Sequence, residues 1–237
     1  MFEIVIEVCA LLLPVGMAVV FHEMAHGYAA LYFGDDTAKK YGRLTLNPIA
    51  HIHWFGTIVM PIALYFLTLQ AAGRGFLFAF AKPVPVAFDR LRNPKRDMMF
   101  VAAAGPASNL VLASGFAVIF HLLEWLAPES LSIFTLMING APIPISYSAM
   151  NLLFFILFVS VYINVVLALI NLIPILPADG GRIVSGLLPN VLAEKFARIE
   201  PWGLFLLILL LYYNPLGIIN WTIKPLIDIL VNLLLWL

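Results

Sequence analysis

The chain has 237 residues, of which 63% are hydrophobic and only 11% are charged, whereas ordinary soluble domains carry roughly 25% charged residues. This composition predicts an all-α polytopic membrane protein and excludes an ordinary soluble domain. Lysine plus arginine number 13, as do aspartate plus glutamate, and the sequence has no basic patch, so we expect no nucleic-acid partner.

The first apolar segment, near residues 4–33, carries the motif HEMAH at 22–26. On a helix, positions i and i+4 share one face, so His22 and His26 could hold one Zn²⁺. Glu23 beside such an ion could act as the base that deprotonates a water whose pKa the metal lowers toward about 7. The alternative is two histidines bonded to neighbouring helices. Three ionisable groups within five residues at membrane depth favour the metal site, because unpaired they would be costly.

The same segment contains Cys9, the single cysteine of the chain. A single cysteine excludes an internal disulfide and a zinc site built from thiolates. The segment lacks the basic start and the cleavage site of a secretory signal, so we expect it to remain as a membrane helix.

Residues 54–72 form an apolar stretch that Pro61 interrupts. The flanking loops, 34–53 and 73–97, are both rich in lysine and arginine, whereas 127–149 has no basic residue. The positive-inside bias therefore places both basic loops in the cytoplasm and 127–149 outside. We expect 54–72 to be a re-entrant hairpin and the N-terminus to lie outside, with six full spans as the alternative.

The segment Lys82-Pro83-Val84-Pro85-Val86 follows this hairpin. In an extended chain the prolines deprive one edge of donors, whereas Val84 and Val86 keep theirs on the other edge. That edge could accept one substrate strand by β-augmentation. The alternative is a rigid linker of polyproline type.

Further spans are predicted near 98–126, 150–173, 203–221 and, more weakly, 222–237. We therefore expect five to six transmembrane helices with a re-entrant or short β-containing insertion. No repeat or linker divides the chain. We expect one integral-membrane domain over 1–237, with a catalytic core at about 4–185 and C-terminal membrane helices at about 203–237.

A third metal ligand is expected in the segment from Asn171 to Gly181. Pro174 and Pro177 should unwind the chain after the 150–173 helix, and Asp179 could then point into a polar cavity. The alternative is a membrane-exit turn in which Asp179 caps the next helix. Zn²⁺ with two neutral histidines, Asp179 and Glu23 sums to zero charge, which favours the ligand interpretation in a low-dielectric site.

These motifs, in this order, resemble the site-2 protease family of intramembrane zinc metalloproteases: HEMAH, Lys82 to Val86, Gly105-Pro106-Ala107-Ser108-Asn109, and Asn171 to Gly181 in the form NxxPxxPxDG. The resemblance covers about residues 20 to 185 and implies one Zn²⁺ per chain held by His22, His26 and Asp179, with Glu23 as the base. It also implies a transmembrane protein substrate cut within the lipid bilayer, in a multi-pass protein of a prokaryotic inner or plasma membrane. No PDZ or CBS domain is present, as in the small core-only subgroup. No oligomeric state follows from these patterns.

Two asparagines are candidate substrate-binding residues. By the resemblance, Asn171 binds the substrate backbone or the developing oxyanion, a role in which one donor can contribute about 3–4 kcal/mol. Asn109 either acts similarly or bonds across a helix interface, which typically contributes about 1 kcal/mol. His51 and His53 depart from the family pattern and could bind a second metal or lie at the interface beside Trp54.

Two other functions fit parts of the sequence. One is a metal carrier without proteolytic activity, because intramembrane histidine and aspartate also mark ion pathways. The other is a different class of zincin that uses Glu124 as third ligand. The expected topology places Glu124 at the outer end of its helix, far from His22.

Overall fold

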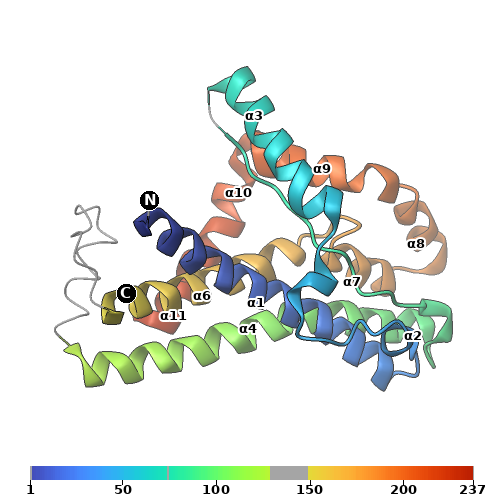
Figure 1. Ribbon diagram of the computed structural model, residues 1–237. Helices are drawn as coiled ribbons and strands as arrows, with labels where there is room; N and C mark the ends of the chain where they lie inside the picture. The colour runs from blue at the N-terminus through green and yellow to red at the C-terminus, as the bar shows by residue number, and fades with distance from the viewer. Residues whose placement is uncertain (1, 74, 129–148, 237) are drawn as a thin grey trace.

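The structure is a computed structural model that describes residues 2–73, 75–128 and 149–236, so most of the predicted outer loop 127–149 lies outside it. Three long helices form the centre of the molecule and pack pairwise against one another: α1 (Phe2–Tyr32), α4 (Pro94–Leu126) and α6 (Ala149–Asn171) (Figure 1). The described residues form helices and no strand, which confirms the all-α fold.

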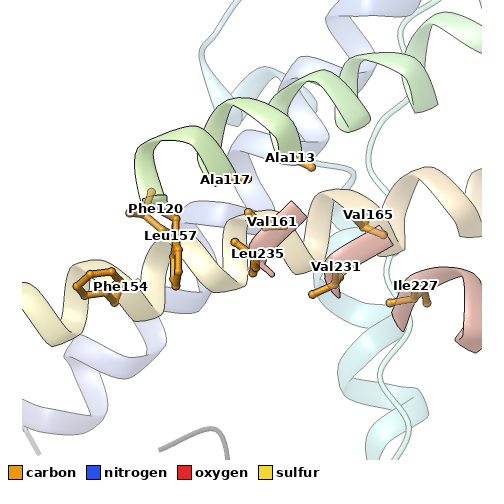
Figure 2. Packing of buried hydrophobic residues seen from close by; sticks show 10 residues of the cluster. All are labelled: Ala113, Ala117, Phe120, Phe154, Leu157, Val161, Val165, Ile227, Val231 and Leu235. Carbon is orange, nitrogen blue, oxygen red and sulfur yellow. The ribbon is translucent and has the colours of Figure 1, made fainter. Parts of the chain in front are cut away.

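A hydrophobic core joins α4 and α6 to the last helix, α11 (Ile223–Leu235). Ala113 and Ala117 of α4 lie one turn apart, and such small side chains let helices approach closely in a membrane. At the end of this core the rings of Phe120 and Phe154 meet edge to face, with 5.1 Å between their centroids. Figure 2 shows these residues with the other members: Leu157, Val161, Val165, Ile227, Val231 and Leu235.

The short helices after α1 and α6 gather at one end of the bundle, and both termini lie toward the other end (Figure 1). This end carries α2 (Thr37–Lys40), α7 (Asp179–Leu187) and α8 (Asn190–Ala197). The two basic loops meet here, because the N–H of Arg92 donates to the Phe33 carbonyl at 3.0 Å and Arg90 lies 3.8 Å from Asp36. Their proximity agrees with the expectation that both lie on one side of the membrane.

The 54–72 stretch leaves this end and comes back to it. It consists of a π-helical turn (Trp54–Val59) that continues into α3 (Met60–Ala72). The chain then returns in an extended conformation, and we call residues 75–87 the return segment. The N–H of Phe80 donates to the Gly56 carbonyl at 3.1 Å, and the N–H of Lys82 to the His51 carbonyl at 2.9 Å. The start of the 54–72 stretch therefore lies beside the end of the return segment, as a re-entrant hairpin requires.

The C-terminal region differs from the prediction. We expected one span over 203–221, but α9 (Glu200–Tyr213) ends where Asn214 adopts a left-handed conformation with φ 44°. Pro215 follows, and a proline cannot donate the backbone hydrogen bond that would continue the helix. A 3₁₀ turn (Pro215–Gly217) and α10 (Ile218–Trp221) lead into α11 instead.

Five helical stretches of the described chain are long and apolar enough to cross a membrane: Ala10–Tyr32, Trp54–Ala71, Pro94–Leu126, Ala149–Asn171 and Ile218–Leu235. The helices α8 and α9, bent by 67° against each other, make a sixth if they are taken as one broken span. The protein is therefore a multi-pass membrane protein, as its composition predicts.

Candidate metal centre

The histidines of the HExxH motif lie on one face of α1, as their spacing predicts. The Nε2 atoms of His22 and His26 are 3.0 Å apart, and both side chains are largely shielded from solvent. Both residues belong to the stretch Ala10–Tyr32, so the pair lies within a membrane-spanning helix.

Asp179 comes to this pair from the segment after α6. That helix ends at Asn171, the chain turns through Pro174 and Pro177, and α7 begins at Asp179. Its Oδ2 atom lies 3.1 Å from Nε2 of His22 and 3.4 Å from Nε2 of His26. We call these three atoms the acceptor cluster.

The hydrogen bonds behind the histidines decide which nitrogens carry protons. Nδ1 of His22 lies 2.6 Å from Oδ1 of Asn109, and Nδ1 of His26 lies 2.7 Å from the carbonyl oxygen of Val101. Both oxygens can only accept, so each Nδ1 carries the proton and each neutral imidazole directs the lone pair of Nε2 into the cluster. The orientation of the Asn109 amide follows from its nitrogen, which donates elsewhere.

With both imidazoles neutral, three acceptor atoms converge without a proton among them. Oδ2 of Asp179 is buried and has no hydrogen-bond donor in the described structure. Such a group of lone pairs is repulsive unless a cation lies among them. Two imidazole nitrogens and one carboxylate oxygen are also the ligands of many catalytic zinc sites, which keep a fourth position open. The residues present thus fit a zinc ion, and within the described chain no other group of three potential ligands lies as close together.

A chain of buried amides supports the cluster from behind. The Asn109 amide nitrogen donates to the Ala18 carbonyl at 3.0 Å and to Oδ1 of Asn164 at 2.9 Å. Asn164 in turn donates to the Ser160 carbonyl at 2.8 Å, and both asparagines are fully buried. This polar chain links α1, α4 and α6. Asn164 was missed by the sequence analysis, although a lone amide in an apolar span signals that it needs a partner.

These bonds favour the interhelical alternative for Asn109. Both hydrogens of its amide nitrogen are donated within the protein, and its oxygen accepts from His22. A role of Asn109 in substrate binding stays a prediction.

Gly105 is a second residue that the sequence analysis did not single out for the metal. It lies on α4 across from the two imidazoles. A Cβ atom at this position would overlap His26 at Nε2 and would come within 2.7 Å of Cε1 of His22. Only a residue without a side chain therefore leaves the imidazoles in place.

Glu23 points to a different partner. Its Oε2 accepts a hydrogen bond from the backbone N–H of Val84 at 2.7 Å. A second carboxylate near the end of α1, that of Asp35, accepts from the N–H of Ala87 at 2.7 Å. The return segment is thus tied to the region of α1 that carries the HExxH motif.

The remaining candidate substrate residues are placed as follows. The donor of Val84 is used within the chain, and Val86 packs against the small apolar cluster around Ala30 and Leu91. The amide nitrogen of Asn171 donates to the Leu167 carbonyl of its own helix at 2.9 Å. Roles of these three residues in substrate binding stay predictions.

The other histidines lie apart from the cluster. His51 bonds to the Thr45 carbonyl at 2.9 Å, and Nδ1 of His53 accepts the N–H of Gly56 at 2.9 Å. Glu124, the third ligand of the alternative zincin, lies 3.0 Å from His121 instead. None of these side chains joins a group of three potential metal ligands in the described part of the chain.

The chain is similar to a known peptidase family and to named proteins of two bacteria. The family described as Peptidase family M50 matches residues 10–212. The chain is 35% identical over 209 residues to "Putative zinc metalloprotease YwhC" of Bacillus subtilis (strain 168), covering 87% of this chain and 80% of that protein. It is 33% identical over 98 residues to "Putative zinc metalloprotease Rip2" of Mycolicibacterium smegmatis (strain ATCC 700084 / mc(2)155), covering 41% of this chain and 34% of that protein. No solved structure matches the chain.

Proposed function

The chain belongs to peptidase family M50, and on that premise we propose that it is an intramembrane zinc metalloprotease that hydrolyses a peptide bond in a transmembrane segment of a membrane-protein substrate. The family and the names of both relatives support the coarser statement that it is a zinc metalloprotease. The observation that carries the finer proposal is the acceptor cluster beside Glu23, held between membrane-spanning helices.

In this proposal His22, His26 and Asp179 hold one zinc ion per chain. A bound zinc ion supplies Lewis acidity, which polarises the scissile carbonyl and lowers the pKa of a water in the open position. Asn109 and the Val101 carbonyl keep the proton on Nδ1 of each histidine, so that both Nε2 atoms remain available as ligands.

Glu23 is the proposed base. Its carboxylate takes the proton of the attacking water and passes it to the nitrogen of the leaving amine as the peptide bond breaks. Glu23 follows His22 directly on α1, and its Oε2 is oriented by the N–H of Val84. The base therefore has a fixed direction before substrate arrives, which favours proton transfer over a short distance.

A transmembrane helix hides its amides in internal hydrogen bonds and must unwind before it can be cleaved. We propose that the return segment, through Val84 and Val86, and the Asn171 amide contact the unwound strand. Pairing at Val84 would require its N–H to leave Glu23 or to be shared with it. We further propose that the chain acts as one integral-membrane domain in a prokaryotic inner or plasma membrane.

The test compares wild-type protein with Glu23→Gln, each expressed in cells that lack the natural copy. Mass spectrometry of membrane peptides should find cleaved transmembrane segments with the wild type and none with the variant, while both purified proteins contain zinc. A metal carrier would instead keep transporting in Glu23→Gln and would generate no cleaved peptides in either strain.

A further inference from the structure

The helix α9 lies against the segment that delivers Asp179. Gly203, in the first turns of α9, is buried. The carbonyl oxygen of Leu176 occupies the space that a Cβ atom on Gly203 would fill, and Cδ of Pro177 would lie 3.2 Å from that atom. A side chain at 203 therefore cannot be accommodated unless α9 and the Leu176–Pro177 backbone move apart.

The contacted backbone is two residues from the cluster and is tightly wound. The N–H of Ala178 donates to the Ile175 carbonyl at 2.9 Å, and the N–H of Gly181 donates to the Ala178 carbonyl at 3.0 Å. Leu176, Ala178 and Asp179 are all buried. These hydrogen bonds and this burial leave the segment little conformational freedom. A displacement of Leu176 should therefore also displace the carboxylate of Asp179.

Further contacts join α9 to the surroundings of the site. At its start, Glu200 lies 3.7 Å from Arg182 of α7, and the guanidinium of Arg182 lies over the ring of Phe88 at 5.1 Å. At its end, the ring of Tyr212 lies 5.2 Å from that of Phe76 in the return segment. One helix thus touches both irregular segments that build the site.

We propose that Gly203 is a positioning residue for the metal centre, because close docking of α9 on Leu176 and Pro177 holds Asp179 against the two histidines. This inference rests on the proposed function, in which Asp179 is a zinc ligand. It assigns to α9, which carries none of the motifs named above, an influence on metal affinity. Displacing α9 is expected to weaken zinc binding without altering any ligand.

The first test substitutes Gly203→Ala and uses Gly115→Ala as its matched control. Both substitutions raise helix propensity equally, but a Cβ on Gly115 meets nothing within 4 Å. Competition with a chelator should show zinc affinity lowered roughly tenfold to a hundredfold in Gly203→Ala and unchanged in Gly115→Ala. The visible spectrum of the cobalt-substituted protein should change only in Gly203→Ala. Wild-type affinity and spectrum in Gly203→Ala would overturn the inference.

The second test uses the wild-type protein and does not depend on how a variant folds. Coupling between two sites is reciprocal, so if docking of α9 favours zinc binding, zinc must favour docking of α9. Adding zinc to metal-free protein should therefore slow amide hydrogen exchange in residues 200–213 more than in α11. Equal exchange of α9 with and without zinc would overturn the inference.

Failure of this inference differs from failure of the proposed function. If Asp179→Ala loses zinc while Gly203→Ala binds it normally, Asp179 remains a ligand and only the role of Gly203 is refuted. If Asp179→Ala binds zinc as the wild type does, the proposed ligand set itself is refuted.

Discussion

The carboxylate of Glu23 is bound to the backbone N–H of Val84, a residue 61 positions later in the chain, with 2.7 Å between Oε2 and the nitrogen. The proposed base is therefore oriented by the return segment and not by its own helix alone. This hydrogen bond connects the return segment to α1, the helix that carries the HExxH motif. A change in the return segment should consequently alter hydrolysis without touching the metal ligands.

Replacing Val84 by proline removes the N–H that Glu23 accepts. We expect hydrolysis of a membrane-embedded substrate to fall by roughly 100-fold, the cost of a misplaced catalytic group, while zinc content stays normal. Pro83→Ala, which removes no donor, should have a mild effect. Equal and small effects of both substitutions would identify the segment as a linker.

Removal of any proposed ligand should deplete the metal. Purified wild-type protein is expected to contain about one zinc per chain, and His22→Ala, His26→Ala and Asp179→Ala should each lower this occupancy because two ligands make an incomplete site. Glu23→Gln serves as the control that retains zinc. Elemental analysis measures the zinc content per chain. Full zinc occupancy in Asp179→Ala would exclude Asp179 as the third ligand.

The buried amides should affect the metal although they do not touch it. Asn109→Ala leaves Nδ1 of His22 without its acceptor, and loss of such a partner typically weakens metal affinity 10–100-fold. It also strands buried polar groups, at a cost of about 1–3 kcal/mol in stability. Asn164→Ala should act in the same direction but more weakly, since it lies one bond further from the histidine.

Ser114→Ala is a suitable control for both amide variants. Ser114 lies on the same helix as Asn109 but donates only to the Leu110 carbonyl of that helix. Zinc titration of all three variants should separate a supporting role from a general loss of helix packing. Equal zinc affinities in Asn109→Ala and Ser114→Ala would contradict the supporting role.

Gly105→Ala should abolish zinc binding, because the added methyl group overlaps Nε2 of His26. Gly115→Ala on the same helix adds an identical group in open space and should bind zinc normally. Isothermal titration of the two metal-free proteins measures the difference. Normal binding in Gly105→Ala would mean that α4 lies further from α1 than the structure places it.

Topology can be tested with single cysteines. In a protein whose Cys9 is replaced, cysteines at positions 40 and 92 should react only with a reagent applied from the cytoplasmic side, since the two basic loops meet at one end of the molecule. Labelling of the two positions from opposite sides would restore six full spans.

The ligand candidates could be predicted because their signals are local. Two histidines four apart share one helix face, an aspartate after two prolines marks a break in a membrane helix, and long apolar runs reveal most membrane helices. Gly105 and Gly203 could not be predicted in the same way, since each is required by a neighbour distant in sequence. The alternation around Val84 predicted an edge whose donors face a substrate strand, whereas in the structure the N–H of Val84 donates to Glu23.

The predicted span over 203–221 did not take account of Pro215, which closely follows the end of α9. Pro215 marks a helix boundary, yet the surrounding apolar residues suggested an unbroken span to 221. Hydropathy reports whether a segment suits a membrane and says little about where its helix stops. The left-handed Asn214 is the local conformation that ends it.

The hydrogen bonds from Asn164 through Asn109 to His22 hold α6, α4 and α1 together. Drawing α1, α4 or α6 sideways would break these bonds in a medium that offers no water to replace them. For the proposed function, we therefore expect a substrate to reach the site without separating the central helices, on the side where the return segment contacts α9 through Phe76 and Tyr212. The same bonds should keep the metal centre intact when the protein is extracted from the bilayer into detergent.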